Sequence, residues 1–390
     1  MHLLFATSLV PDVSPATGYD IANAAIVAAM RRVGVRVTVM GYAWPGREVA
    51  DPDDTIVLGE LDVRNETASL GVKARWTLGA LTSGMTVSSY KMLALPRASV
   101  SHVLDHLGAV DAYVLNAVQF AGAFGDLFAS KPFAFVAHNV EHRSAEENAA
   151  AARSPLQRWL FAREARLLKT LELELCRRAR HVFTLAEGDR APLGVSRDDR
   201  SSVLPLVTRT APYRARRTRK VEADAVLLGT WTWQPNRIGL EWFLEAVTPH
   251  LPADFRVRIG GAIPAGMVPS RAGVEFVGRV ADATEFVRSG AAVALVSQAG
   301  TGVQLKTIEA FELGLPCVAT PKSLRGVDML PSNCSVAEEP RAFARALVQT
   351  AKMGREIDGA GFFEAQRASL DRRVRFGLSR LGHVAAREFA

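Results

Sequence analysis

Short apolar runs alternate along this chain with longer stretches in which apolar residues recur every three or four positions. Runs of four to eight apolar residues predict buried strands, and the longer periodic stretches predict helices. The first run covers residues 2–8, and a helical stretch at 21–32 and a second run at 35–40 follow it. Gly34 stands where this helix would end. The pattern therefore predicts two parallel strands joined by a right-handed crossover.

The same alternation continues through the chain. Further strands are predicted at 55–58, 112–116, 133–137, 181–185, 203–206, 225–229, 256–260, 274–277, 291–296 and from 317 onwards. Further helices are predicted at 97–107, 155–179, 340–352 and 362–387. Strands that alternate with helices predict the α/β class with parallel sheets. One stretch, 44–95, has a weaker pattern, and we predict an irregular insertion with two short strands and a polar segment around 76–89.

The length of 390 residues is enough for two domains of ordinary size. The sharpest change in composition falls at TRTAPYRARRTRK, residues 208–220, which is basic and contains no acidic residue. We interpret it as a linker, with contact to anionic lipid as the alternative. The predicted organisation is a first domain at 1–207, a basic linker at 208–222, a second domain at 223–365 and a C-terminal helix at 366–390 that returns to the first domain.

Composition excludes several classes of protein. A hydrophobic content of 48% with 22% charged residues is typical of a globular chain, and no apolar run approaches the length of about 20 residues that spans a bilayer. Cys176, Cys317 and Cys334 lack metal-ligand spacing and suit a reducing compartment. The first residues resemble a strand rather than a signal peptide, so we expect a cytoplasmic protein. The net charge of +7 suits an anionic membrane or a polyanionic substrate, whereas no motif indicates nucleic acid.

The stretch GTGVQLKTIEAFELGLPCVAT, residues 300–320, carries candidate chemistry. A glycine-rich loop that leads from a strand into a helix presents free backbone N–H groups, and the helix dipole favours an anion there. Lys306, predicted about one turn into the helix, would add a cation, and Glu309 lies on the same helix face. This predicts a phosphate site. A solvated Lys–Glu pair on an ordinary helix is the alternative.

Two further segments flank this stretch. HNVEH, residues 138–142, follows a predicted strand at the carboxyl edge of the first sheet, where α/β folds place their sites. A metal site there is disfavoured, because His138 and His142 have no evident third ligand, while a solvated loop histidine stays open. GTWTWQPNRIGLEWFLEAV, residues 229–247, leads from a strand into a helix for which Asn236 is a candidate N-cap.

The pattern G-x-G-x-x-x-K-x-x-E-A, the following G-x-P-x-V-A-T and the upstream W-x-P-N resemble the nucleotide-sugar site of retaining glycosyltransferases of family 4 (group 1). That resemblance implies the GT-B fold, with two Rossmann-like parallel-sheet domains facing a central cleft. It implies that loop amides and Lys306 hold the donor diphosphate and that Glu309 binds the ribose. His138 would face the donor sugar, which makes His138, Lys306 and Glu309 the predicted catalytic residues. The predicted donor-binding residues are Gly18, Arg237, Arg279, Gly300, Thr301, Gly302, Val303, Lys306 and Glu309.

Thr301 stands where many members of that family carry an acid that contacts the sugar, so the donor sugar stays open. The resemblance implies retaining transfer from a UDP-sugar or GDP-sugar to a hydroxyl of a glycan or lipid-linked acceptor, with the 44–95 insertion as an acceptor surface. It implies no metal and no other cofactor. Bacterial surface polysaccharide or glycolipid synthesis, with peripheral contact to the anionic inner membrane, would suit the charge. A nucleotide-sugar 2-epimerase and a non-catalytic nucleotide-binding relative are the alternatives.

Overall fold

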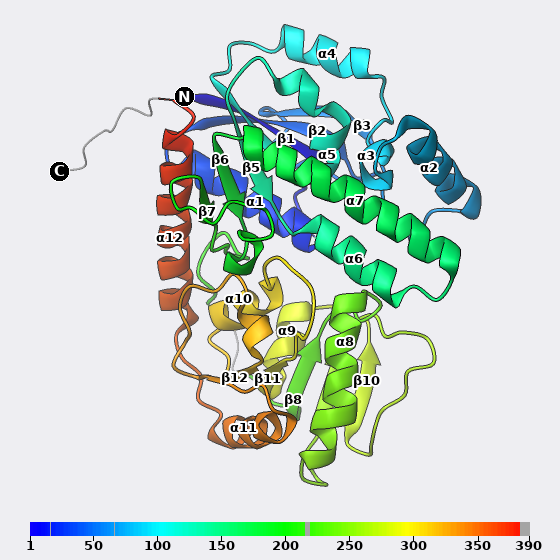
Figure 1. Cartoon of the computed structure of the whole chain (residues 1–390). Coiled ribbons are helices and arrows are strands. Elements are labelled where there is room, and N and C mark those ends of the chain that lie inside the picture. Colours follow the sequence, from blue (N-terminus) through cyan, green and yellow to red (C-terminus); the bar gives the residue numbers. More distant parts are fainter. Residues whose placement is uncertain (16, 66, 215–218, 383–390) are drawn as a thin grey trace, which may run out of the picture. The chain divides into compact units, whose positions relative to one another are not determined.

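The computed structural model describes residues 1–15, 17–65, 67–214 and 219–382. The chain forms two compact units, one made of Met1–Leu204 with Ser369–Ala390 and the other of Pro205–Ala368 (Figure 1). Each unit contains its own parallel sheet, so the predicted α/β class with two parallel-sheet domains is confirmed.

Within the described residues, the first unit contains a seven-stranded sheet in the order β3-β2-β1-β4-β5-β6-β7. Its strands are β1 His2–Leu9, β2 Arg36–Ala43, β3 Thr55–Glu60, β4 Ala112–Asn116, β5 Phe133–Ala137, β6 His181–Thr184 and β7 Ser201–Val203. Leu3 of β1 is aligned with Val37 of β2 and with Ala112 of β4, and all these ladders are parallel. Their carboxyl ends consequently share one edge of the sheet, where polar residues of different strands can meet.

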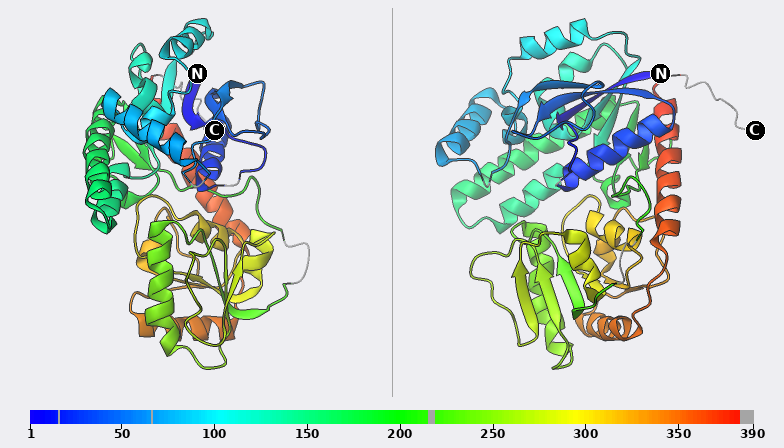
Figure 2. Two further views of the ribbon diagram at one scale, coloured as in Figure 1. Left: turned by 90° about the vertical axis from the view of Figure 1, so that its right-hand side faces the viewer. Right: turned by 180° about the vertical axis from the view of Figure 1, so that it is seen from behind.

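Helices cover both faces of this sheet (Figure 2). They are α1 Gly18–Arg32, α2 Leu70–Ser83, α3 Val87–Lys91, α4 Arg97–His106, α5 Val118–Phe124, α6 Glu141–Ala151 and α7 Pro155–Arg178, with 3₁₀ turns η1 Gly125–Phe128 and η2 Glu187–Asp189. The main core lies between the sheet and α5 and α7, where Phe120, Phe124 and Leu168 pack against strand residues such as Leu4 and Tyr42. Burial of these large side chains holds the sheet edge in place.

The second unit contains, within the described residues, a six-stranded parallel sheet in the order β10-β9-β8-β11-β12-β13. Its strands are β8 Ala223–Leu228, β9 Val257–Gly260, β10 Val274–Gly278, β11 Gly290–Leu295, β12 Cys317–Ala319 and β13 Cys334–Val336. Its helices are α8 Gln234–Trp242, α9 Ala283–Arg288, α10 Leu305–Glu312 and α11 Pro340–Met353, with η3 Phe243–Val247, η4 Thr248–His250 and η5 Pro321–Leu324 as shorter turns. Phe243 and Phe343 join α8, η3 and α11 over one face of the sheet.

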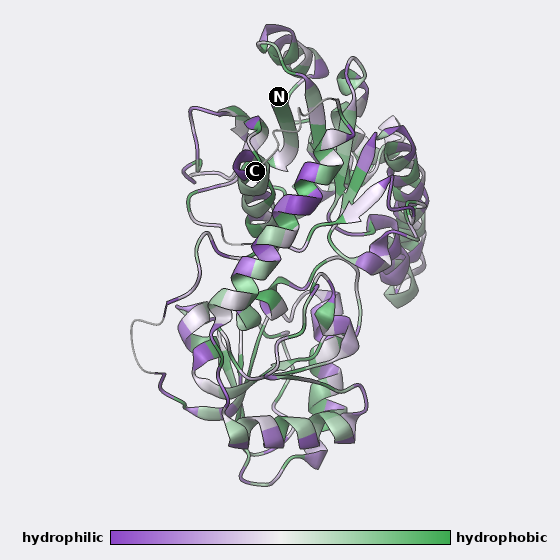
Figure 3. Ribbon diagram, turned by 90° about the vertical axis from the view of Figure 1, so that its left-hand side faces the viewer, coloured by the Kyte–Doolittle hydropathy of each residue, from purple (hydrophilic) through white to green (hydrophobic). Residues whose placement is uncertain are grey.

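The last described helix, α12 Gly359–Ser379, begins in the second unit and ends in the first. Hydrophilic and hydrophobic residues are interspersed along it (Figure 3). In the first unit, the Phe376 ring lies 5.6 Å from the ring of His181, and Asp371 accepts hydrogen bonds from Arg32. The predicted C-terminal helix thus begins earlier than expected, and residues 383–390 of that prediction lie outside the described residues.

The prediction for residues 44–95 was wrong. The stretch 44–95 is not an irregular insertion, since α2 and α3 cover most of its second half and the polar segment around 76–89 is helical. Ser69 and Thr86 begin these helices as side-chain N-caps, a signal that the sequence already contained.

Parts of the predicted linker 208–222 are packed against the second unit, which was not expected. Residues 215–218 lie outside the described residues, but the flanking positions belong to the second unit. Arg219 donates to the carbonyl of Arg288 at 2.7 Å and to Glu356 at 2.7 Å, and its side chain is 7% exposed. Thr208 donates from its backbone N–H to Glu312 at 2.8 Å. Thr208 and Arg219 are therefore packed against the second unit, whereas Arg214 and Lys220 are exposed.

Candidate functional site

The glycine-rich loop of the second unit runs from the end of β11 to the start of α10. Gly300 and Gly302 have positive φ angles of 87° and 73°, a backbone region that side chains other than glycine rarely adopt. A Cβ added at Gly300 would lie 3.1 Å from the Cβ of Pro235. The two glycines therefore allow the loop to turn back tightly beside the start of α8.

Arg325, which follows η5, holds this loop from the side. Its Nε donates to the carbonyl of Gly302 at 3.0 Å and its Nη2 to that of Ala299 at 3.1 Å. Its own carbonyl accepts from the backbone N–H of Gln304 at 3.0 Å, directly before α10. The loop carbonyls are thereby turned toward Arg325, and a positive charge stands beside the loop. Sequence reasoning missed Arg325, because its partners are 23 and 26 residues away.

Beneath the loop lies a buried set of hydroxyl groups. Ser323 Oγ accepts from the backbone N–H of Ser297 at 2.8 Å and donates to the carbonyl of Leu295 at 2.7 Å. Thr320 Oγ1 donates to the carbonyl of Ser297 at 2.6 Å, and Thr307 of α10 donates to the carbonyl of Ser323 at 2.7 Å. These bonds satisfy buried backbone groups and fix the start of α10 to the end of β11.

Lys306 is the second residue of α10, so the prediction that it lies one turn into the helix was wrong. Its Nζ donates to Oδ1 of Asn236 at 3.2 Å and lies 5.3 Å from the centre of the Trp231 ring. Burial, with a further contribution from the charge of Arg325, lowers the pKa of Lys306 to about 8. A buried ammonium group in the first turn of a helix gains from any anion placed beside it.

The prediction that Asn236 is the N-cap of α8 was wrong, because Trp233 occupies that position. Asn236 lies inside the first turn, where its Nδ2 donates to the carbonyl of Thr230 at 3.1 Å and its Oδ1 accepts from Lys306. The W-x-P-N segment is thus joined to α10 through one side chain. Trp231 packs in the core with its Nε1 bonded to the carbonyl of Gly260 at 2.8 Å, while Trp233 is 48% exposed.

Glu309 lies on α10 one turn after Lys306, and its carboxylate has partners within the second unit. Oε1 accepts from Nη2 of Arg209 at 3.2 Å, and the hydroxyl of Thr284 lies 3.5 Å away. Burial raises the pKa of Glu309, and the charge of Arg209 opposes that shift. Arg209 belongs to the stretch predicted as a linker, and no local pattern indicated that it pairs with a carboxylate 100 residues away.

Glu312, one turn further along α10, is buried and anchors the same segment. It accepts from both the N–H and the hydroxyl of Thr208, and Nε of Arg209 lies 3.9 Å from its Oε2. Burial raises the pKa of Glu312 to about 7. Glu309 and Glu312 therefore share one cation, which ties residues 208–209 to the side of α10.

The remaining predicted residues of the second unit are two loop positions and two arginines. Thr301 and Val303 are half-buried loop positions. Arg237, on α8, donates to Glu241 at 2.7 Å and is 41% exposed at its side chain. Arg279 is exposed just after β10. The structure therefore brings Gly300, Gly302 and Lys306 together, with Glu309 on the same helix.

In the first unit, His138 directly follows β5 and is buried among polar residues from neighbouring strands. Its Nε2 lies 2.9 Å from Oδ1 of Asn116, at the end of β4, and its ring lies 4.8 Å from that of Tyr19. Asn116 Nδ2 in turn donates to Thr7 Oγ1 at 3.0 Å and to Asn23 Oδ1 at 2.7 Å. Since Asn116 uses its amide as a donor there, its oxygen faces Nε2–H of the imidazole.

This arrangement determines which nitrogen of His138 is available. Burial lowers the pKa of His138 to about 4, so the ring is neutral near pH 7. With Nε2 donating to Asn116, Nδ1 carries the lone pair, and among the described residues it has no hydrogen-bond partner. His138 can therefore accept a hydrogen bond but cannot supply a positive charge.

Gly18, the other predicted residue of the first unit, is the first residue of α1. Thr17 precedes it as the N-cap and accepts from the N–H of Asp20 at 3.2 Å, while Asp20 accepts from the N–H of Thr17 at 3.1 Å. This capping box begins the helix that carries Tyr19 and Asn23 into the network around His138. Gly18 thus lies at a helix N-terminus next to that network.

His142 has a structural partner. Its Nδ1 lies 2.6 Å from Oε2 of Glu172, which also accepts from the backbone N–H of His142 at 3.0 Å. The other carboxylate oxygen accepts from the N–H of Glu141 at 2.8 Å, so Glu172 caps the start of α6. His138 precedes that helix and does not share a face with His142. Within the described residues no group of three or more His, Cys, Asp or Glu side chains could hold a metal ion.

Residues 222–352 match the family model described as Glycosyl transferases group 1. The matched stretch lies within the second unit and includes the glycine-rich loop, Lys306 and Glu309. The predicted enzyme class, a glycosyltransferase, is confirmed by this match. No curated protein sequence matches the chain significantly.

Solved glycosyltransferase structures share the fold over the whole chain. WaaG, a glycosyltransferase involved in lipopolysaccharide biosynthesis, is 15% identical with a TM-score of 0.57, and the match covers 97% of this chain and 99% of WaaG. HepE of Anabaena in complex with UDP-glucose is 15% identical with a TM-score of 0.58, covering 98% and 100%. The UDP-forming trehalose-phosphate synthase of Burkholderia xenovorans is 12% identical with a TM-score of 0.54, covering 97% and 98%. These likenesses confirm the predicted GT-B fold.

In the part of the chain that the structure describes, no helix combines the length and the apolar character needed to cross a bilayer.

Proposed function

We propose that this protein is a retaining glycosyltransferase that moves a sugar from a nucleotide-diphosphate sugar to a hydroxyl group of a glycan or lipid-linked acceptor. The observation that carries the proposal is the arrangement at the start of α10. Two positive-φ glycines precede a helix whose second residue is a half-buried lysine, and a carboxylate follows one turn later. This is the chemistry that a diphosphate joined to a ribose requires.

Each group has a role in this proposal. The N–H groups of the loop and Lys306 bind the diphosphate and stabilise the negative charge that develops as the sugar leaves. Glu309 accepts hydrogen bonds from the ribose hydroxyls, either beside its hydrogen bond from Arg209 or in place of it. His138, neutral and with Nδ1 as an acceptor, orients a hydroxyl of the donor sugar. Gly18, Arg237 and Arg279 complete the proposed donor contacts.

The reaction proposed here uses no metal ion and no other cofactor. The charge of the leaving diphosphate is met by Lys306, by the dipole of α10 and by Arg325 beside the loop. The acceptor hydroxyl attacks the sugar on the face that the diphosphate leaves, so the product keeps the configuration of the donor.

Among the structures with the same fold, HepE was solved in complex with UDP-glucose and WaaG is involved in lipopolysaccharide biosynthesis. These relatives support UDP-sugars as the first donors to test, with GDP-sugars second, and a bacterial surface polysaccharide or glycolipid as the acceptor. The net charge of +7 supports work at the anionic inner face of the plasma membrane.

Calorimetric titration of UDP and GDP tests the donor site. We expect one nucleotide to bind the wild-type protein, and both Lys306→Ala and Glu309→Ala to weaken that binding by about tenfold or more, since each removes a charge-assisted contact. Glu364→Ala is the matched control, because Glu364 is an exposed acid on α12 in the same unit. Absence of nucleotide binding, or equal binding by Glu309→Ala and the wild type, would contradict the proposal.

A second experiment separates transfer from its alternatives. Incubation of the bound donor with candidate acceptors, followed by NMR of the anomeric proton, is expected to show a product with the donor's configuration. An inverted anomer would contradict the retaining reaction. A changed configuration at C2 of the sugar would indicate an epimerase, and binding without any turnover would indicate a non-catalytic relative.

A further inference from the structure

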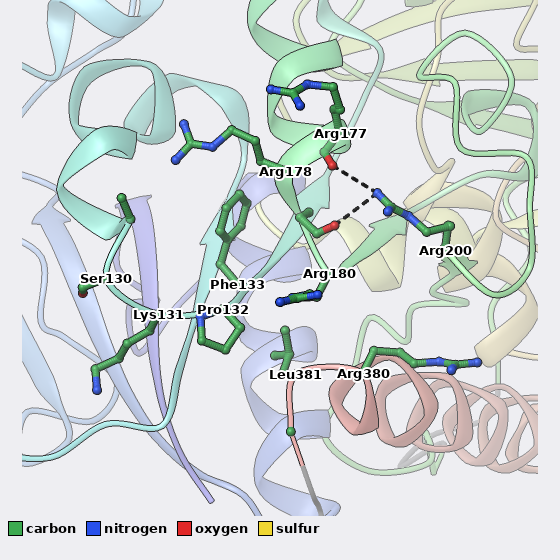
Figure 4. Close-up of a pocket in the computed structure, with 13 residues that line it drawn as sticks. Ser130, Lys131, Pro132, Phe133, Arg177, Arg178, Arg180, Arg200, Arg380 and Leu381 are labelled. Atoms are coloured by element: carbon green, nitrogen blue, oxygen red, sulfur yellow. Dashed lines mark hydrogen bonds between the residues drawn. The ribbon is translucent and has the colours of Figure 1, made fainter.

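A second feature of the first unit, here called the basic pocket, lies at the amino ends of β5, β6 and β7 (Figure 4). It has a volume of about 630 Å³. The cations that line it come from four segments of the chain and are Lys131, Arg177, Arg178, Arg180, Arg200 and Arg380. No Asp or Glu is among the described residues that line it. The pocket therefore concentrates positive charge.

Two of these arginines have structural partners. Arg200 donates from Nη2 to the carbonyls of Cys176 at 3.0 Å and Ala179 at 3.2 Å, and so caps the end of α7. Arg177 makes a two-pronged contact with Glu174, with Nε at 3.0 Å and Nη2 at 2.8 Å from its carboxylate oxygens. These contacts explain why Arg177 and Arg200 occupy their positions without any ligand.

Three of the other four cations lack such partners. Within the described residues, Lys131, Arg178 and Arg180 make no ion pair, and Arg178 and Arg180 are exposed. Arg380 lies over the ring of Phe376 at 4.9 Å. Figure 4 shows the side chains of Arg178, the last residue of α7, and of Arg180, which lies between α7 and β6, with Phe133 beside them.

The negative ends of two helix dipoles offset only part of this positive charge. The ends of α7 and α12 lie at the pocket, and each helix C-terminus contributes a partial negative charge of about one half. Most of the positive charge is thus left uncompensated, and like charges held within one pocket repel one another. A bound anion with several charges would remove that repulsion.

We propose that the basic pocket binds a ligand that carries two or more phosphate groups. Guanidinium groups match phosphate oxygens with paired hydrogen bonds, and three arginines and a lysine besides Arg177 and Arg200 line the pocket. A volume of about 630 Å³ lies in the range of small-molecule sites. The phosphates can belong to a free oligophosphate compound or to lipid headgroups, and the tests below distinguish these sources.

The basic pocket is separate from the residues assigned to sugar transfer. It adjoins Phe133, the first residue of β5, whereas His138 follows the last residue of that strand. Five residues of a strand span about 16 Å, so the two features lie at opposite edges of the sheet. The proposal therefore does not depend on the donor, the acceptor or the reaction.

The test uses the full-length protein carrying Lys306→Ala, so that the glycine-rich loop does not contribute phosphate binding. Inorganic triphosphate is titrated by calorimetry into this protein and into a pocket variant with Arg178→Gln and Arg180→Gln. The control carries Arg75→Gln and Arg166→Gln, two exposed arginines on α2 and α7 of the same unit that do not line the pocket. Arg380→Gln gives an independent measurement from another helix.

We expect the dissociation constant for triphosphate to rise about tenfold or more in the pocket variant and to stay within about twofold in the control. Sedimentation with phosphatidylcholine vesicles, with and without phosphatidylglycerol, is measured on the same proteins. If only the vesicle binding depends on Arg178 and Arg180, the proposal holds with lipid headgroups as the source. If neither probe binds, or if the pocket variant and the control behave alike in both assays, the proposal is overturned.

Discussion

Arg209 donates a hydrogen bond to Glu309 across 3.2 Å, so the carboxylate assigned to the donor ribose has a cationic partner within its own unit. Burial raises the pKa of Glu309, with a smaller contribution from the charge of Asp282, and the charge of Arg209 opposes that effect. Arg209 thus favours the ionised form of this half-buried carboxylate, the form that accepts hydrogen bonds from hydroxyl groups.

Replacement of Arg209 should therefore change how nucleotide binding responds to pH. In Arg209→Gln the pKa of Glu309 is expected to rise, because the favourable charge is lost while burial stays the same. The affinity for UDP should then begin to fall at a higher pH than in the wild type as the solution is acidified. Calorimetry across the acidic range measures this, and identical pH profiles for the two proteins would contradict it.

The lowered pKa of Lys306 predicts that the affinity for UDP also falls as the pH rises above neutrality. This pKa is lowered to about 8, so the free protein loses the charge of Lys306 as the pH rises through that value, whereas a bound diphosphate would hold the proton. The affinity for UDP is expected to fall by about tenfold between pH 7 and pH 9. Lys306→Arg should remove this dependence, since arginine stays charged. A wild-type affinity that does not change over that range would refute the assignment.

Gly300 and Gly34 have nearly the same backbone conformation, so Gly34 serves as a control for a substitution in the glycine-rich loop. Their φ angles are 87° and 88°, but a Cβ at Gly300 would lie 3.1 Å from Pro235, whereas a Cβ at Gly34 meets nothing within 4 Å. Alanine at either position should cost about 1–2 kcal/mol of unfolding free energy from backbone strain. Only Gly300→Ala should also weaken UDP binding. Denaturant unfolding and calorimetry on both variants provide the check, and a loss of binding in Gly34→Ala would count against a local effect.

The contact between His138 and Asn116 predicts a change in titration. The wild-type ring, with its pKa lowered to about 4 by burial, should stay neutral above about pH 5. Asn116→Asp places a carboxylate against Nε2, which favours the charged imidazolium and should raise the pKa of His138. The same change disturbs the bond to Asn23 and should cost about 1–3 kcal/mol of stability.

NMR titration of the histidine rings measures this shift. A His138 resonance that titrates at the same pH in the wild type and in Asn116→Asp would show that the two side chains do not interact in solution. Thermal unfolding of both proteins separates the loss of stability from the change in the pKa.

The sequence by itself determined the class of the fold and the placement of a glycine-rich loop before a helix that carries Lys306 and Glu309. Both depend on short-range spacing: strands are short apolar runs, and Lys306 and Glu309 fall on one face of α10 because they lie three residues apart. The helices within 44–95 were missed, although the capping residues Ser69 and Thr86 were visible. There the apolar period was too weak to outweigh the polar composition.

Only the tertiary structure decided the partners of these groups. Arg209 reaches Glu309 across 100 residues, Arg325 reaches Gly302 across 23, and Glu172 reaches His142 across 30. Such contacts form because parallel strands bring distant loops to one edge of a sheet, and no local periodicity records them. The sequence could therefore predict which residues carry charge near α10, whereas the pKa of each group depends on burial and partners that only folding supplies.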